Sequence, residues 1–313
     1  MAKRRRTKKQ KAFTKKITSF IIALLLIGFG RLTAAEDFSL DSLLAQFSTT
    51  TATSTASTIA ASDDLRIVFL DVGQADSTLI QAAGKNMLID AGNNEDGDLV
   101  VSTLQAYGVE TLDFVIPTHP HEDHVGGMDD VIDAFDIGTV LLPNATSTTQ
   151  TYEDMLDSIA NKGLTATEPI VGDTYTLGDC TFTILGPVWD YGDDMNNWSV
   201  SIQLIHGENS FVFTGDAEAE AESDMLGTGL DLHGDVFQAG HHGSTTSNTE
   251  DFLNAVNPKY VVISCGANNS YSHPHEEILE RFAERNITVY RTDTNGTIVA
   301  TCDGTNISWE TEY

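Results

Sequence analysis

The run Thr118–His124 constrains this chain more than any other segment, because it places three of the nine histidines within seven residues, directly after an apolar stretch. Neutral imidazole and carboxylate suit a borderline divalent cation, and residues two apart project to the same side of an extended loop. We therefore expect His119 and His121 to bind one metal ion, and Asp123 and His124 to face a second ion beside it. The alternative, a solvated polar loop, leaves the clustering unexplained.

The N-terminal part has the pattern of an export signal. Residues 2–16 carry nine lysines and arginines and no acid, and residues 17–30 are apolar apart from Thr18 and Ser19. This run is shorter than the ~20 residues that span a bilayer, and small residues follow it. We expect 1–35 to be a signal peptide or N-terminal anchor, with cleavage favoured, and the protein to be extracellular or at the cell surface.

Residues 36–63 are rich in Ser, Thr and Ala, which bury too little apolar surface to fold, so they are predicted to be a linker. Residues 64–313 are long enough for one α/β domain. The three cysteines, Cys180, Cys265 and Cys302, lie in apolar stretches and are expected in the core, with one disulfide pair left open.

The acidic composition limits the partners of the folded part. The formal charge of the chain is −29, but ten of its seventeen basic residues lie in positions 1–31, so the remainder carries 7 − 46 = −39. Proteins that bind nucleic acid usually present basic patches. A nucleic-acid partner is therefore disfavoured against a small-molecule or phosphodiester substrate. Membrane contact is expected only through the N-terminal segment, and the protein is expected to be a monomer.

Short apolar runs alternate with helical patterns along the folded part. Helices are predicted at 98–107, 129–135, 152–162 and 275–285. Strands are predicted at 65–70, 77–81, 86–90, 112–116, 139–142, 174–177, 181–185, 201–206, 210–214, 236–239 and 260–264, and within 288–303. Two strand-rich halves with outer helices predict a four-layer α/β/β/α sandwich whose loops carry the site at one edge.

Three further motifs sit at predicted strand ends. Asp216 follows the strand of 211–214 and a glycine, and can bridge two cations, although a Gly-Asp turn is the default reading of that pair alone. His241 and His242 lie between glycines, where one should bind metal and its neighbour contact substrate. Asp71 can hold a ligand histidine through its second ring nitrogen, or cap its turn.

Two further motifs are candidates for substrate contact. Asn197, with Asn196 and Ser199, can donate to a developing oxyanion or form a plain Asx turn. His273 precedes a predicted helix, where backbone N–H groups favour a phosphate, and is a candidate substrate contact or proton donor.

Together these residues resemble the metallo-β-lactamase superfamily, and most closely the hydrolase domain of ComEC-type competence proteins. The resemblance covers about residues 65–303 and is carried by segments 69–74, 118–127, 196–199, 214–216, 240–244, 263–266 and 272–274. It implies that His119 and His121 bind the first metal, that Asp123 and His124 bind the second, and that Asp216 bridges them. A histidine of the 241–242 pair completes the second site, and a similarity to teichoic-acid phosphorylcholine esterases favours His242. The candidate catalytic residues are then Asp123, His241, His273 and Asn197.

Two departures from the family pattern matter. Most members place a histidine where this chain has Asn196 and Asn197, so the first metal site is expected to be weaker or more open. A full ComEC-type protein has many membrane helices that form a DNA path, whereas this chain has one short apolar segment, so we do not expect a channel.

The predicted cofactors are two divalent metal ions, with zinc favoured and manganese compatible. The predicted function is an exported metal-dependent hydrolase, a phosphodiesterase or nuclease that uses a metal-bound hydroxide. Two alternatives stay open: an acyl hydrolase acting on a lactam or lactone, and a degenerate, non-catalytic domain whose acidic surface binds cations or a basic partner.

Overall fold

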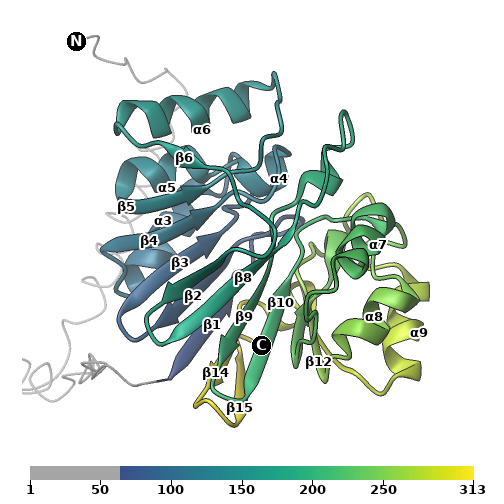
Figure 1. The fold of residues 1–313 in the computed structure, drawn as a ribbon. Helices are drawn as coiled ribbons and strands as arrows, with labels where there is room; N and C mark the ends of the chain where they lie inside the picture. The colour runs from purple at the N-terminus through teal and green to yellow at the C-terminus, as the bar shows by residue number, and fades with distance from the viewer. Residues whose placement is uncertain (1–63) are drawn as a thin grey trace, which may run out of the picture. The chain divides into compact units, whose positions relative to one another are not determined.

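The computed structural model describes residues 64–313, whose strands form two sheets (Figure 1). The predicted signal or anchor (1–35) and linker (36–63) lie outside the described residues. Among residues 64–313, no helix combines the length and apolarity that a membrane span requires.

The first sheet has eight strands in the order β15-β14-β1-β2-β3-β4-β5-β6. Its strands β3 to β6 run parallel, whereas β1 pairs antiparallel with both β2 and β14. The strand bounds are β1 Leu65–Phe69, β2 Thr78–Ala82, β3 Lys85–Ile89, β4 Thr111–Ile116, β5 Asp136–Leu141, β6 Ala166–Thr167, β14 Ile298–Cys302 and β15 Ile307–Thr311.

The second sheet has seven strands in the order β13-β12-β11-β10-β9-β8-β7. Strands β10 to β13 run parallel, and β7 to β10 form an antiparallel meander. The bounds are β7 Thr174–Leu177, β8 Cys180–Gly186, β9 Ser201–His206, β10 Asn209–Phe213, β11 Val236–Gln238, β12 Tyr260–Ile263 and β13 Thr288–Arg291.

The two sheets pack face to face because their central strands carry apolar side chains on both faces, and the inner set of each sheet meets that of the other. In β1, Leu65, Ile67 and Phe69 enter the core between the sheets, while Val68 enters the core under the outer helices. The rings of Phe69 and Phe213 lie 6.3 Å apart across the sandwich. This arrangement makes every central strand buried on both sides.

Helices cover both outer faces (Figure 1). On the first sheet, α3, α5 and α6 bury side chains such as Leu104, Ile132 and Met155; on the second, α7, α8 and α9 bury Met225, Phe252 and Phe282. The helix bounds are α3 Gly97–Ala106, α4 Glu122–Val125, α5 Met128–Ala134, α6 Gln150–Asn161, α7 Ala219–Thr228, α8 Glu250–Val256, α9 Glu276–Glu284 and α10 Thr292–Asn295, with short 3-10 helices η1 Asn196–Trp198 and η2 Gly240–Gly243. The predicted four-layer α/β/β/α sandwich is confirmed.

The structure adds elements that the sequence patterns did not predict. Helix α7 is acidic and buries only a few apolar residues, so its periodicity is weak. The predicted strands within 288–303 prove to be β13 and β14, which α10 separates and which belong to opposite sheets. All three cysteines are buried and free, so the disulfide that the sequence left open is not formed.

Candidate metal centre

The candidate site lies where several strands end at one edge of the sandwich. Strand β4 ends just before the histidine loop, β10 ends two residues before Gly215-Asp216, and β11 ends just before η2, which carries His241 and His242. The histidine loop runs directly into α4, which includes Asp123 and His124. The structure therefore brings together motifs that are more than 100 residues apart, as expected from their positions at strand ends.

The first set of ligand atoms, which we call the His124 group, consists of His124, His242, Asp123 and the Oδ1 atom of Asp216. His124 Nε2 lies 3.3 Å from Asp216 Oδ1 and 3.9 Å from Asp123 Oδ2. His242 Nε2 lies 3.2 Å from Asp123 Oδ2 and 3.8 Å from Asp216 Oδ1. Ligand atoms about 2.0–2.2 Å from a four-coordinate zinc are about 3.3–3.6 Å apart, so this spacing suits one small cation.

The second set, the His119 group, consists of His119, His121, His241 and the Oδ2 atom of Asp216. His119 Nε2 lies 3.0 Å from His121 Nδ1 and 3.8 Å from Asp216 Oδ2. His241 Nε2 lies 3.5 Å from the same Asp216 oxygen. Asp216 thus turns one carboxylate oxygen toward each group.

The buried histidines are held by their second ring nitrogen, so that Nε2 points inward. His124 Nδ1 lies 2.7 Å from Asp90 Oδ2, and His242 Nδ1 lies 3.0 Å from the Ser264 carbonyl oxygen. Such partners fix the ring orientation of metal ligands. Asp71 was the candidate for this role, but its carboxylate accepts from the Gly73 N–H and caps its turn.

Asp90 was missed, although it follows β3 in the same strand-end position that identified the other carboxylates. Its oxygens also accept from the Thr118 N–H at 2.8 Å and the Thr118 hydroxyl at 2.7 Å. Asp90 therefore ties the start of the histidine loop to the ring that it orients.

The electrostatics of the site fit a cation. Burial alone would lower the pKa of His124, but the carboxylates of Asp216, Asp90 and Asp123 outweigh it and hold that pKa well above its usual value. Burial would raise the pKa of Asp216, but His124 and His242 hold it well below its usual value. His124 Nε2 and Asp216 Oδ1 are buried without a hydrogen-bond partner among residues 64–313. A divalent cation between them would satisfy both atoms.

Asp76 is a further buried carboxylate near the His124 group. One ligand-type atom from each of Asp76, His124, Asp216 and His242 lies within 4.8 Å of the others. However, Asp76 approaches the Nδ1 atoms of both histidines, at 3.9 and 4.0 Å, where the rings already have partners. Its other oxygen accepts from Gln238 Nε2 at 2.8 Å. Asp76 therefore lies behind the rings and adds negative charge to the site.

Asn197 does not reach the site, which corrects its assignment as a catalytic candidate. The residue is 1% exposed; its amide oxygen accepts from the Glu218 N–H, and its Nδ2 donates to Asp194. Its amide is therefore engaged in joining two loops, rather than in the local Asx turn that the sequence left as the alternative. Its neighbour Asn196 lines the cavity instead and donates to Glu218 Oε1 at 3.0 Å.

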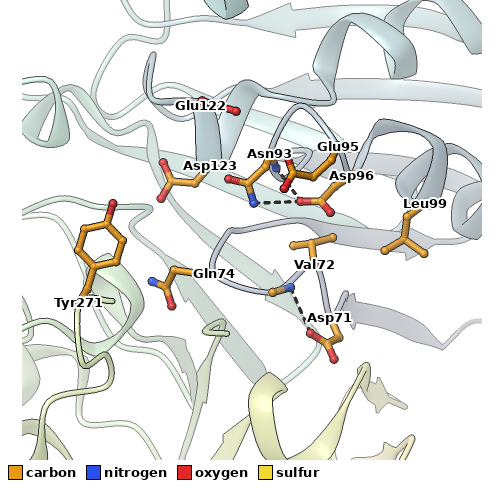
Figure 2. A pocket seen from close by; sticks show the side chains of 11 residues that line it. Asp71, Val72, Gln74, Asn93, Glu95, Asp96, Leu99, Glu122, Asp123 and Tyr271 are labelled. Carbon is orange, nitrogen blue, oxygen red and sulfur yellow. Dashed lines mark hydrogen bonds between the residues drawn. The ribbon is translucent and has the colours of Figure 1, made fainter. Parts of the chain in front are cut away.

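A cavity of about 350 Å³ opens over both groups and continues into a groove of about 620 Å³. The two hollows share Gln74, Glu122, Asp123 and Tyr271 (Figure 2). Figure 2 shows the Asp123 carboxylate beside the groove, with Tyr271 and Gln74 across from it. Within residues 64–313, neither hollow is lined by a lysine or arginine, and the groove also has Asp71, Glu95 and Asp96.

His273 forms part of the cavity wall beside the two groups. Its ring stacks on Tyr271, with centroids 5.7 Å apart, and lies 5.4 Å from that of His241. Burial, followed by the positive fields of His241 and His242, lowers the pKa of His273 to about 4. A neutral ring with one N–H suits the predicted substrate contact better than the predicted proton donor.

Comparison with known proteins agrees with this geometry. Residues 70–267 match the sequence model of the family described as "Metallo-beta-lactamase superfamily". The chain is 30% identical to ComE operon protein 3 of Bacillus subtilis over 255 residues, which is 76% of this chain and 33% of that protein. It is 28% identical to competence protein ComA of Neisseria gonorrhoeae over 246 residues, which is 75% of this chain and 32% of that protein.

The chain spans about a third of the length of these relatives. Among solved structures, a mutant of the CmlA beta-hydroxylase superposes with a TM-score of 0.52 at 15% identity, covering 76% of this chain and 53% of that one. At this identity the likeness concerns the fold alone. The resemblance that the sequence motifs indicated, including that to ComEC-type competence proteins, is confirmed by these matches.

Proposed function

The chain belongs to the metallo-beta-lactamase superfamily, and on that premise we propose that it is a metal-dependent hydrolase that cleaves a phosphodiester with two divalent cations. The observation that carries the proposal is the buried carboxylate of Asp216, which turns one oxygen toward each group of histidines. The His124 group would hold one ion and the His119 group the other. Zinc and manganese both suit these mixed ligands.

When bound, two such cations make a water molecule acidic enough to supply the nucleophile near neutral pH and neutralise charge on the attacked phosphorus. The chain's own residues position the reaction. Asp90 and Ser264 orient the rings of the His124 group, and the neutral ring of His273 can donate a hydrogen bond to a substrate oxygen in the cavity.

The lining of the hollows favours a substrate with a single phosphodiester. A phosphodiester carries one negative charge, which the cations would offset. Each further phosphate would meet carboxylates, and no lysine or arginine of the described residues lines either hollow. The acidic groove suits a neutral or positively charged leaving part. We therefore favour a small phosphodiester over nucleic acid.

We place this activity outside the cytoplasm, in a monomer, on the basis of the basic and apolar pattern of residues 2–30. Expression of the full chain with a C-terminal tag, followed by cell fractionation, tests this. Recovery of the protein with cytoplasmic markers would contradict export.

The test of the activity is hydrolysis of bis(p-nitrophenyl) phosphate by purified protein loaded with zinc or with manganese. We expect activity that a chelator removes and that His121→Ala reduces at least a hundredfold, because each removes the cations that activate water. His233→Ala is the matched control, because that ring lies outside the two groups and hydrogen-bonds to the Val256 carbonyl oxygen. Full activity in chelator would refute the proposal.

The same assay separates the alternatives when a chromogenic lactam, a lactone and DNA are added to the panel. Turnover of the lactam or lactone without phosphodiester cleavage would establish the acyl hydrolase. DNA cleavage faster than aryl phosphodiester cleavage would establish a nuclease. One inert ion per chain and no turnover would establish the non-catalytic domain.

A further inference from the structure

We propose that His241 and His242 are both metal ligands, one for each ion, and that Glu218 positions His241 for this role. The inference deepens the proposed function, because it assigns the protein side of the first metal site. From the sequence, one histidine of this pair was expected to contact substrate, and the first site was expected to lack a histidine at Asn196-Asn197. The geometry supplies that histidine from another part of the chain.

The two rings straddle the Asp216 carboxylate. His241 Nε2 lies 3.5 Å from Oδ2, the oxygen that faces the His119 group, whereas His242 Nε2 lies 3.8 Å from Oδ1, the oxygen that faces the His124 group. The ring centroids are 6.0 Å apart and the ring planes differ by 64°. Adjacent residues thus present their Nε2 atoms to two different oxygens of one carboxylate.

An unusual backbone produces this divergence. His241 and His242 both have positive φ, at 51° and 54°, in a region that non-glycine residues seldom occupy. The turn is held from outside, because the His241 N–H donates to Gly215 O and the Asn248 side chain donates to Gly240 O. A strained backbone maintained in this way at a cluster of ligand-type side chains is typical of functional sites.

Glu218 gives His241 the kind of support that His124 and His242 have from Asp90 and the Ser264 carbonyl oxygen. Its Oε1 atom lies 3.2 Å from His241 Nδ1, and Thr246 Oγ1 lies 3.0 Å from the same nitrogen. A carboxylate on one ring nitrogen leaves the other free to bind a cation and fixes its direction. Asn196 donates to the same Glu218 oxygen. The segment where most family members have a histidine thus holds in place the carboxylate that positions His241.

The exposure of the rings predicts which ion is bound more weakly. The His241 side chain is 21% exposed, whereas those of His119, His124 and His242 are 2% or less. His121 is also exposed, so the His119 group opens to the cavity. We expect its ion to exchange with solvent more readily than the ion of the His124 group.

The test is metal content of the purified protein after zinc loading and gel filtration, combined with chelator competition to obtain the two dissociation constants. Wild type should retain two zinc ions per chain, and His241→Gly should retain one. Glycine is chosen because it removes the ring and tolerates the positive φ, so folding is preserved. His273→Ala is the matched control: that ring borders the same cavity, but among residues 64–313 it comes within 4 Å of no carboxylate, so both ions should stay.

Glu218→Ala should raise the dissociation constant of the weaker ion about 10- to 100-fold, and Glu218→Gln, which keeps an acceptor oxygen, should recover part of that loss. If Glu218 had a purely structural role, both substitutions would lower the melting temperature, and Glu218→Ala and Glu218→Gln would bind the metal with equal affinity.

The proposal is overturned if His241→Gly keeps two ions with wild-type dissociation constants, or if wild type holds one ion that His241→Gly does not affect. Either result would leave His241 to the substrate. Phosphodiester hydrolysis by wild type in that case would show that the proposed function survives while this inference fails.

Discussion

Replacing Glu222 with alanine should destabilise the protein and remove hydrogen bonds that hold the segment with the histidine pair in place. Glu222 lies on α7, is fully buried, and accepts from the backbone N–H groups of Asn248 at 2.6 Å and Thr249 at 2.8 Å. Asn248 in turn bonds Gly240 with both ends of its amide. The loss of this carboxylate therefore leaves the buried Asn248 N–H and the part-buried Thr249 N–H without this acceptor and weakens the support that Asn248 gives to η2.

The magnitude follows from the two bonds. A hydrogen bond to a charged group contributes about 1.5–3 kcal/mol, so the two together contribute about 3–6 kcal/mol. Burial raises the pKa of Glu222, and its removal recovers part of that desolvation cost. We expect a net loss of about 2–4 kcal/mol in the free energy of unfolding.

Urea unfolding followed by circular dichroism, in chelator so that metal binding does not contribute, measures this loss. Glu220→Ala is the matched control, because Glu220 is an exposed glutamate on the same helix and shares the small change in helix propensity. A loss below about 1 kcal/mol for Glu222→Ala, or an equal loss in the control, would refute the reasoning. Zinc affinity should also fall in Glu222→Ala and stay unchanged in the control.

Three further outcomes are expected. Asp90→Asn, which tolerates the left-handed backbone at that position (φ 57°), should weaken zinc binding about 10- to 100-fold by chelator competition, and unchanged affinity would show that Asp90 does not orient its ring. In Gly126→Ala the added Cβ clashes with the backbone of Asn93 and Asn94, so the melting temperature should fall. In Gly227→Ala the added Cβ meets no atom of residues 64–313 within 4 Å, so the protein should gain about 0.5–1 kcal/mol in stability; equal effects of the two substitutions would contradict the packing. Burial raises the pKa of Cys180 and of Cys265 to about 12, and all three cysteines are buried. A thiol reagent at pH 8 should therefore detect no cysteine in the native protein and three in denaturant. Rapid reaction of a thiol in the native protein would contradict this burial.

The sequence alone predicted the sandwich and most of its ligand-type residues, because both are local patterns. Short continuous apolar runs mark strands that are buried on both faces. The Thr118–His124 run keeps its ligand-type residues within one loop and one helical turn. Helix α7 was missed because its acidic sequence has little apolar periodicity, and it owes its place to a few contacts with the second sheet.

The partners of the ligands were harder to predict, because they depend on which loops meet. Asp90 and Glu218 look in the sequence like ordinary turn and helix-start residues, and only the fold brings them to ring nitrogens of His124 and His241. Asn197 failed for the same reason, since nothing local reveals that its amide joins two loops.

The pairing of β1 with β14 bears on how this protein can be made. Phe69 of β1 lies opposite Ile298 of β14 in this pairing. One edge of β1 therefore pairs with the neighbouring strand β2, while the other edge pairs with a strand more than 200 residues later in the chain. Contacts of such long sequence separation slow folding. During synthesis, the eight-stranded sheet stays open at this edge until β14 leaves the ribosome, and Asp216 and the histidine pair are then already translated. We therefore expect the nascent chain to acquire tight metal binding only after β14 has been translated, when both sheets can close around the site.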